Sequence, residues 1–256
     1  MNRLVVSTQL AAGDSLVLFA KMLDSVSFAD AVTVYNMERT DTAAQKLFRD
    51  YQVKVINVKT PQVVEQIRAN QVREARGDWV LIMDFDEIIT QALATEILAV
   101  CSMKPSAASA YFIPSENFSL GNRIMHGGWG DDYVMRLIKK SEFVDWGSNI
   151  HALPTFEGSS GKLKNYMEHH KDESLAQMVE KTNRYSDIEA QQFYDGALPA
   201  VTSFTLIRKL KMEMLRRGIL KKGVLDGPVG VIQSIYQGYS VFVSYAKLFE
   251  LQHREK

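Results

Sequence analysis

The feature that most restricts the fold of this chain is the run Trp79–Met83, in which all five residues are apolar. A strand that is apolar on both faces is typical of a parallel sheet covered by helices, whereas a half-exposed strand alternates apolar and polar residues. Before it, β-branched runs alternate with helix-like stretches, giving strands at 4–8, 31–35 and 53–58 and helices at 15–25, 42–51 and 62–76. The first hundred residues are therefore predicted to form a nucleotide-binding α/β half, with its ligand at the carboxyl edge of the strands.

The alternation of strands and helices becomes less regular after residue 108. Strands are predicted at 110–113 and 133–138, with a Gly-rich loop at 125–132 between them. Ser174 and Gln177 have the spacing of a capping box and predict a helix that ends near residue 193. We expect one domain over 1–200, with a nucleotide-binding half at 1–100 and an acceptor half at 101–200, and a helical extension at 201–256.

The extension differs in composition from the rest of the chain. Between residues 208 and 222 there are seven basic residues and a single acid, Glu213. After Gly227-Pro228, a spacing of three and four predicts an amphipathic helix whose apolar face contains Ile232, Ile235, Tyr236, Tyr239, Phe242, Val243, Ala246 and Phe249. Polar residues at 233, 237, 240, 244 and 247 lie opposite. Two interpretations stay open: docking of 208–251 on an anionic membrane leaflet, and closure of a core or dimer interface.

Composition excludes several classes of protein. Lys plus Arg and Asp plus Glu both number 30, so the net charge is zero, which argues against a nucleic-acid partner. The lone Cys101 forms no internal disulfide, and no apolar run reaches the roughly 18 residues of a spanning helix. We expect a cytoplasmic protein, with association at the inner face of the cytoplasmic membrane as an option.

The acidic turn Asp84-Phe85-Asp86-Glu87 follows directly after the apolar strand. Two carboxylates two residues apart at a strand end can converge on one divalent cation. Mg²⁺ or Mn²⁺ held in this way keeps positions free for phosphate oxygens and neutralises charge on a departing diphosphate. The alternative is a solvated acidic loop.

Arg68-Ala69-Asn70 and the segment from Gly77 to Glu87 resemble the core signature of family 2 glycosyltransferases of the GT-A fold. A second group of motifs, in the same order as in that family's lipopolysaccharide core β-glucosyltransferase branch, comprises Gly128-Trp129, Asp132, Arg136-Leu137, His151-Ala152, 161–165 and His169. The resemblance covers about residues 1–200. It implies a Rossmann-like mixed sheet flanked by helices.

The resemblance also implies a reaction. It is the inverting transfer of a hexose from a nucleotide-diphosphate sugar to a hydroxyl of a glycan or lipid-linked acceptor in cell-envelope or lipopolysaccharide biosynthesis, with Mg²⁺ or Mn²⁺. Asp86 matches the principal metal ligand and Asp84 a contact to donor ribose or metal. The other donor-binding positions implied are Thr8, Gln9, Asn36, Asp41 and Arg68.

The chain departs from the family pattern at three positions. Gln9 begins the pair that is usually Asn-Glu, Asn36 replaces an aspartate, and Ala69 replaces an asparagine. These substitutions leave the metal ligands in place and affect the identity of the nucleobase.

The inverting step needs a general base on the acceptor hydroxyl. Asp132 matches the family aspartate after the Gly-Trp loop, and like-charge repulsion from Asp131 would raise its pKa. Asp131, His151, Glu157 and His169 compete for this role, and a loop aspartate that caps a turn is the alternative. Gly128 and Trp129, which precede Asp132 in the same loop, are predicted to contact the acceptor sugar. The alternative is that Trp129 is a core aromatic at a domain seam.

Two other functions remain open. A nucleotidyltransferase also uses paired carboxylates on an α/β sheet, but it usually carries a Gly-rich basic loop near the N-terminus, and residues 9–14 contain no Lys or Arg. A catalytically degenerate scaffold that binds sugar nucleotides at a membrane is compatible with the substitutions at Gln9, Asn36 and Ala69.

Overall fold

The computed structural model describes residues 2–103, 108–130, 132–149 and 152–254. It forms two compact units. Unit 1 contains the chain up to residue 115 together with 133–169, and unit 2 contains 116–132 and the chain from residue 170 onward. Segments 116–132 and 170–200 of the expected acceptor half thus belong to unit 2, and the domain boundary at residue 200 stays a prediction.

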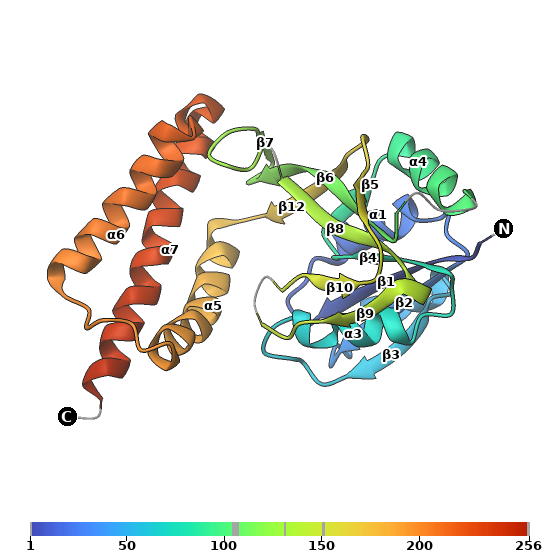
Figure 1. The fold of residues 1–256 in the computed structure, drawn as a ribbon, viewed down its shortest axis with the longest axis horizontal. Coiled ribbons are helices and arrows are strands. Elements are labelled where there is room, and N and C mark those ends of the chain that lie inside the picture. The colour runs from blue at the N-terminus through green and yellow to red at the C-terminus, as the bar shows by residue number, and fades with distance from the viewer. Residues whose placement is uncertain (1, 104–107, 131, 150–151, 255–256) are drawn as a thin grey trace. The chain divides into compact units, whose positions relative to one another are not determined.

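A mixed sheet forms the centre of unit 1 (Figure 1). Its strand order is β3-β2-β1-β4-β8-β6-β12-β5, with β11 and β7 pairing to β6, while β9 and β10 form a separate ribbon. The first four of these strands are parallel, and β4–β8 and β12–β5 are antiparallel. The strands are β1 (Leu4–Ala11), β2 (Ala31–Met37), β3 (Lys54–Val58), β4 (Trp79–Met83), β5 (Glu87–Ile89), β6 (Ala110–Ser119), β7 (Asn122–Ile124), β8 (Asp132–Lys139), β9 (Phe143–Trp146), β10 (Pro154–Phe156), β11 (Ser160–Lys162) and β12 (Met167–Asp172).

Strand β4 is buried on both faces, as its sequence predicts. Trp79, Leu81 and Met83 belong to one core cluster, and Val80 and Ile82 belong to a second cluster on the other face. Alternate residues of a strand point to opposite faces, so the sheet has a covered core on each side. The acidic turn that follows β4 therefore begins inside the protein.

The helices of unit 1 begin at side-chain caps where the sequence provides them. Ser15, Asp41 and Thr90 each accept a hydrogen bond from a backbone N–H in the first turn of the helix that follows. The helices are α1 (Leu16–Ser25), α2 (Thr42–Asp50), α3 (Glu65–Arg73) and α4 (Gln91–Ser102), with a short 3₁₀ turn, η1 (Lys140–Glu142).

Three long helices dominate unit 2, and α5 and α6 both pack on α7 (Figure 1). They are α5 (Leu175–Asp195), α6 (Ser203–Leu215) and α7 (Gly227–His253), and a π-helical turn, η2 (Arg216–Leu220), and a 3₁₀ turn, η3 (Gly223–Asp226), connect the last two. Ser174 caps α5 as predicted, at 3.2 Å from the Gln177 amide N–H, while the Gln177 side chain accepts from the Glu173 amide. Across the described residues, no helix has both the length and the hydropathy needed to span a bilayer.

Helix α7 is oriented differently from the amphipathic prediction. Gln233 and Ser244 of its polar side are buried, and Ile232 and Ile235 of its apolar side are exposed. Hydrogen bonds compensate this burial: the Gln233 amide donates to Ser119 and Asp172, Tyr236 to Thr182 over 2.7 Å, and Ser244 to Glu189 over 2.6 Å. The periodicity therefore predicts a helix correctly, but it does not predict which face of α7 is buried.

Candidate active site

The sheet brings the acidic turn next to two segments distant in sequence. The parallel pairing of β1 with β4 sets Thr8 opposite Met83, so Gln9 lies beside Asp84. The antiparallel pairing of β12 with β5 sets His169 opposite Glu87. All of these residues belong to unit 1.

Asp84 is enclosed by cationic and amide donors. The guanidinium groups of Arg68 and Arg136 contact opposite oxygens of its carboxylate, and Gln9 Nε2 donates to Oδ1 over 2.5 Å. Burial on its own would raise the pKa of Asp84, but the attraction of the two guanidinium groups outweighs it and holds the pKa well below the ordinary range. Asp84 is therefore an anion fixed by arginines, and its convergence with Asp86 on one cation stays a prediction.

Glu87 is fully buried and also contacts Arg136. Its carboxylate accepts from Arg136 Nη2 over 2.5 Å and from the Asp84 backbone N–H over 2.9 Å. Burial raises the pKa of Glu87, and the negative charge of Asp84 adds to this effect against the pull of Arg136. Arg136 thus bridges two carboxylates in the interior.

Gln9 links β1 to helix α3. Its Oε1 accepts from Arg68 Nη1 over 3.1 Å and from Gln71 Nε2 over 3.0 Å, while its Nε2 holds Asp84. The Gln9 side chain is therefore long enough to join Asp84 to Arg68. Gln9 positions the acidic turn, in addition to any contact with the donor.

Asp86 has a different environment from Asp84. It is buried, and its Oδ1 lies 3.7 Å from Nε2 of His169. Within the described ranges, which omit 104–107, 131 and 150–151, no three His, Cys, Asp or Glu side chains gather in a way that could hold a metal. A carboxylate with an adjacent imidazole is a two-ligand set that Mn²⁺ accepts when phosphate oxygens or water complete the coordination.

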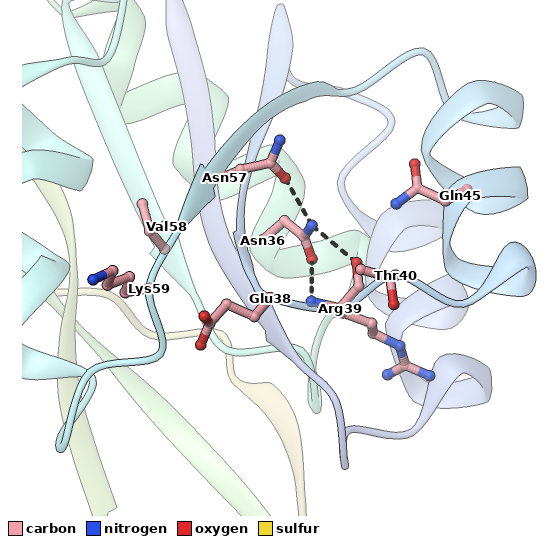
Figure 2. Close-up of a pocket in the computed structure, with 8 residues that line it drawn as sticks. All are labelled: Asn36, Glu38, Arg39, Thr40, Gln45, Asn57, Val58 and Lys59. Carbon is pink, nitrogen blue, oxygen red and sulfur yellow. Dashed lines mark hydrogen bonds between the residues drawn. The ribbon is translucent and has the colours of Figure 1, made fainter.

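A pocket of about 660 Å³ opens at the carboxyl ends of β2 and β3 (Figure 2). Asn36 lies at its centre, where its Nδ2 donates to Asn57 Oδ1 over 2.8 Å and to the Arg39 carbonyl over 3.0 Å. The lining comprises Asn36, Glu38, Arg39, Thr40, Gln45, Asn57, Val58 and Lys59. Amide, hydroxyl and charged groups of this kind can read the polar edge of a heterocycle.

Asp41 and Thr8, two further predicted donor residues, are not part of the lining of this pocket. Asp41 caps α2 through the Ala44 amide over 2.9 Å and accepts from Arg39 Nε over 2.5 Å. Hydrogen bonding to the Ala44 amide and to Arg39 lowers the pKa of Asp41. Arg39 in turn donates to the carbonyl of Asp14 over 2.7 Å and so joins the loops after β1 and β2. Thr8 is fully buried on β1, and its hydroxyl has no hydrogen-bond partner in the part of the chain that the structure describes.

Gly128, Trp129 and Asp132 lie in unit 2, whereas the competing base candidates Glu157 and His169 lie in unit 1. Asn117 is fully buried, and its Nδ2 donates to Asp132 Oδ2 and to the Trp129 carbonyl, over 3.0 Å in each case. The Trp129 ring is buried beneath the Arg217 guanidinium, 4.6 Å from the ring centroid. Gly128 has a φ of 96°, and a side chain there would meet Lys221. Asp131 and His151 lie outside the described residues.

Sequence reasoning named Glu87 and Arg136 only within motifs and did not predict their ion pair, and it did not identify Asn117 as the partner of Asp132. Arg136 is the one charged residue among the apolar positions 134–138, and a buried arginine in such a strand requires a carboxylate partner. That signal was available in the sequence. The identity of the partner depends on the pairing of β4 with β8, which the sequence does not give.

No protein-family model matches the chain. The structure is similar to that of the mannosyltransferase PcManGT from Pyrobaculum calidifontis in complex with GDP-Man and Mn²⁺, with a TM-score of 0.53 and 12% identity over 97% of this chain and 88% of that one. It is also similar to S. aureus TarS 1-349 in complex with UDP-GlcNAc, with a TM-score of 0.48, 12% identity and coverage of 99% and 92%. A third similar structure is glucosyl-3-phosphoglycerate synthase from Mycobacterium tuberculosis, with a TM-score of 0.45, 11% identity and coverage of 77% and 81%.

The first of these similarities bears on the architecture. The mixed sheet, covered by helices on both faces and followed by C-terminal helices, matches that of the mannosyltransferase over nearly the whole chain. The chain therefore has the GT-A fold, as its sequence predicts.

Proposed function

We propose that the chain is an inverting, divalent-metal-dependent glycosyltransferase that moves a hexose from a nucleotide-diphosphate sugar to a hydroxyl of a glycan or lipid-linked acceptor. The observation that carries the proposal is the buried acidic turn at the carboxyl end of β4, where Asp86 faces His169 and Asp84 is fixed by two arginines. On a GT-A sheet, this edge is where a nucleotide ligand binds. A role in cell-envelope or lipopolysaccharide synthesis rests on the sequence resemblance.

Asp86 and His169 are the ligands that fit a divalent cation. Asp84 fits less well as a ligand, because both of its oxygens already contact guanidinium groups. When bound, Mg²⁺ or Mn²⁺ neutralises negative charge on a diphosphate leaving group. The presence of Mn²⁺ with GDP-Man in the similar mannosyltransferase supports a metal of this kind.

Asp84 then has the role of orienting the donor. Its carboxylate is held rigidly by Arg68, Arg136 and Gln9, which leaves remaining lone pairs to accept a hydrogen bond from a ribose hydroxyl. A side chain whose geometry is fixed before the ligand arrives loses little conformational entropy on binding.

The pocket around Asn36 and Asn57 is proposed to take the nucleobase. Replacing Asn57 by Leu removes the acceptor of the Asn36 amide and one polar group of the lining. We expect binding of nucleoside diphosphates to weaken about tenfold, from the loss of one or two hydrogen bonds. Isothermal titration in the presence of Mn²⁺ measures this change.

Inorganic pyrophosphate is the control for the nucleobase pocket. Its affinity should be the same in the Asn57→Leu protein and in the parent, because pyrophosphate has no base. Equal weakening for pyrophosphate and nucleoside diphosphate would place the effect at the metal and contradict the pocket assignment.

Asp132 is proposed as the general base, positioned by Asn117. Asp132→Asn should lower kcat about 10²-fold and leave the donor affinity unchanged, because a general base acts on the acceptor proton. Asn117→Ala should lower kcat less, because the amide that donates to Asp132 and holds it in place is lost. Steady-state rates across pH measure both, and an unaltered kcat in Asp132→Asn would return the role to His151, Glu157 or Asp131.

The whole proposal is tested by titrating UDP, GDP, ADP and CDP with and without Mn²⁺, followed by a turnover screen of the matching nucleotide sugars. A glycosyltransferase binds one diphosphate in a metal-dependent manner and releases it from its sugar. A degenerate scaffold would show metal-dependent binding without turnover. The absence of any metal-dependent diphosphate binding would contradict the proposal.

A further inference from the structure

Helix α6 is covered on one side only. None of residues 203–215, all of which the structure describes, is buried, although the helix packs on α7 through Leu210 and Met214 near Gly238. Phe204 has 74% of its surface exposed, Met212 57% and Ile207 53%. An isolated exposed apolar residue is ordinary, but several large ones on a single helix mark an interaction surface.

The exposed side chains of α6 occupy one helical face. They follow the spacing i, i+3, i+4, i+7, i+8 and i+11, which keeps residues on one side of an α-helix. We call these residues the α6 face: Phe204, Ile207, Arg208, Lys211, Met212 and Leu215. It contains four large apolar side chains, two cations and no acid.

The surrounding charge has the same sign. Glu213 is the single acid between residues 208 and 222, and it is neutralised within the helix by Arg216 at 2.5 Å and Arg217 at 2.8 Å. The next turn of the chain exposes Leu220 and Leu225 together with Lys221 and Lys222. Large apolar and basic side chains therefore continue along the chain beyond α6.

We propose that the α6 face binds the interfacial region of an anionic lipid bilayer. An interfacial helix places its apolar side chains at the boundary of headgroups and acyl chains, while its Lys and Arg contact anionic headgroups. Phe204, Ile207, Met212 and Leu215 would enter the boundary, and Arg208 and Lys211 would remain among the headgroups, with their alkyl stems alongside. This goes beyond the proposed transfer reaction, and its test needs no turnover.

Charge complementarity selects the bilayer over a second copy of the chain. An isologous contact between two α6 faces would bring two copies each of Arg208 and Lys211 into one interface that contains no carboxylate of its own. An anionic headgroup layer neutralises those charges instead. Each basic residue near such a surface strengthens binding about fivefold at physiological salt.

The experiment is flotation of the full chain with vesicles of phosphatidylcholine, alone or mixed with phosphatidylglycerol, in buffer of about 0.1 M and about 1 M salt. We expect binding to the anionic vesicles at low salt and weak binding in the other conditions. The double variant Arg208→Gln/Lys211→Gln should bind about 25-fold more weakly, and Phe204→Ser/Leu215→Ser more than tenfold more weakly.

Matched substitutions in unit 1 serve as controls. Lys46→Gln/Lys54→Gln removes two exposed cations, and Val17→Ser removes an exposed apolar side chain. Both should bind vesicles like the parent chain, and all variants should keep the parent's thermal unfolding, because the substituted side chains are exposed.

Three results would overturn the proposal. One is a failure of the chain to float with anionic vesicles at low salt, and another is equal loss of binding in the unit 1 controls. The third is a stable dimer in sedimentation equilibrium that Phe204→Ser/Leu215→Ser dissociates while vesicle binding is unchanged. That result would assign the α6 face to self-association.

Discussion

Asp86→Asn is expected to abolish the Mn²⁺ dependence of nucleoside diphosphate binding and to lower turnover about 10³-fold. The amide keeps the size of the side chain and removes its charge, so the candidate metal ligand is lost without a cavity. Because Asn has nearly the same size and shape as Asp, the fold should be preserved. Titration calorimetry and initial rates measure the two effects.

His169→Gln is a second test of the metal site, and Asp50→Asn is the control. His169→Gln removes the second candidate ligand and should weaken Mn²⁺ binding in the same direction, by about 10- to 100-fold. Asp50→Asn alters an exposed carboxylate on α2 and should change neither binding nor rate. Metal-dependent binding that survives in both Asp86→Asn and His169→Gln would remove these residues from the metal site.

Arg136→Met is expected to destabilise the protein by about 3–5 kcal/mol, because it leaves Glu87 and Asp84 without a cation that both contact. For a chain of this size, the melting temperature should fall by about 10 °C. Differential scanning calorimetry measures the change. Arg73→Met, which breaks an exposed ion pair to Asp145, should shift the melting temperature little.

The pH dependence of the stability of Arg136→Met shows whether the destabilisation comes from an unpaired buried charge or from poor packing. Without Arg136, the pKa of buried Glu87 rises further above its unfolded value, so the folded state favours the protonated form. Such a group contributes stability below its unfolded pKa and loses it as pH rises through the folded pKa. The destabilisation in Arg136→Met should therefore be smaller at pH 5 than at pH 7.5.

A further variant adds Glu87→Gln to the Arg136→Met protein. The double variant should be more stable at pH 7.5 than Arg136→Met alone, because the buried charge has been removed along with its partner. A destabilisation that is equal at both pH values, and unchanged by Glu87→Gln, would contradict the assigned role of Arg136 as the partner of Glu87.

Local features of the sequence predicted the first half of the fold well. The apolar run Trp79–Met83 requires cover on both faces, and the two core clusters provide it. Ser174 and Gln177 marked the start of α5 because capping depends on neighbouring backbone groups. The acidic turn was located correctly since it follows directly from the end of a strand.

Features that depend on distant pairing were not predicted. Arg136 meets Asp84 through the pairing of β8 with β4, and His169 meets Asp86 through the pairing of β12 with β5. The buried face of α7 was also missed, because Gln233 becomes compatible with the interior only when Ser119 and Asp172 supply acceptors. The metal, nucleobase and general-base assignments remain predictions for the experiments above.

The interior of unit 2 contains hydrogen-bonded polar side chains, and this affects how its helices would respond to a change of solvent. Contacts made by Gln233, Tyr236 and Ser244 are hydrogen bonds, whose strength increases as the local dielectric constant decreases. Association that relied only on expelling water from apolar surfaces would weaken once hydrocarbon replaced water outside. The contacts of Tyr236 with Thr182 and of Ser244 with Glu189 join α7 to α5, so we expect this helix pair to depend less on the exclusion of water than a purely apolar pair would.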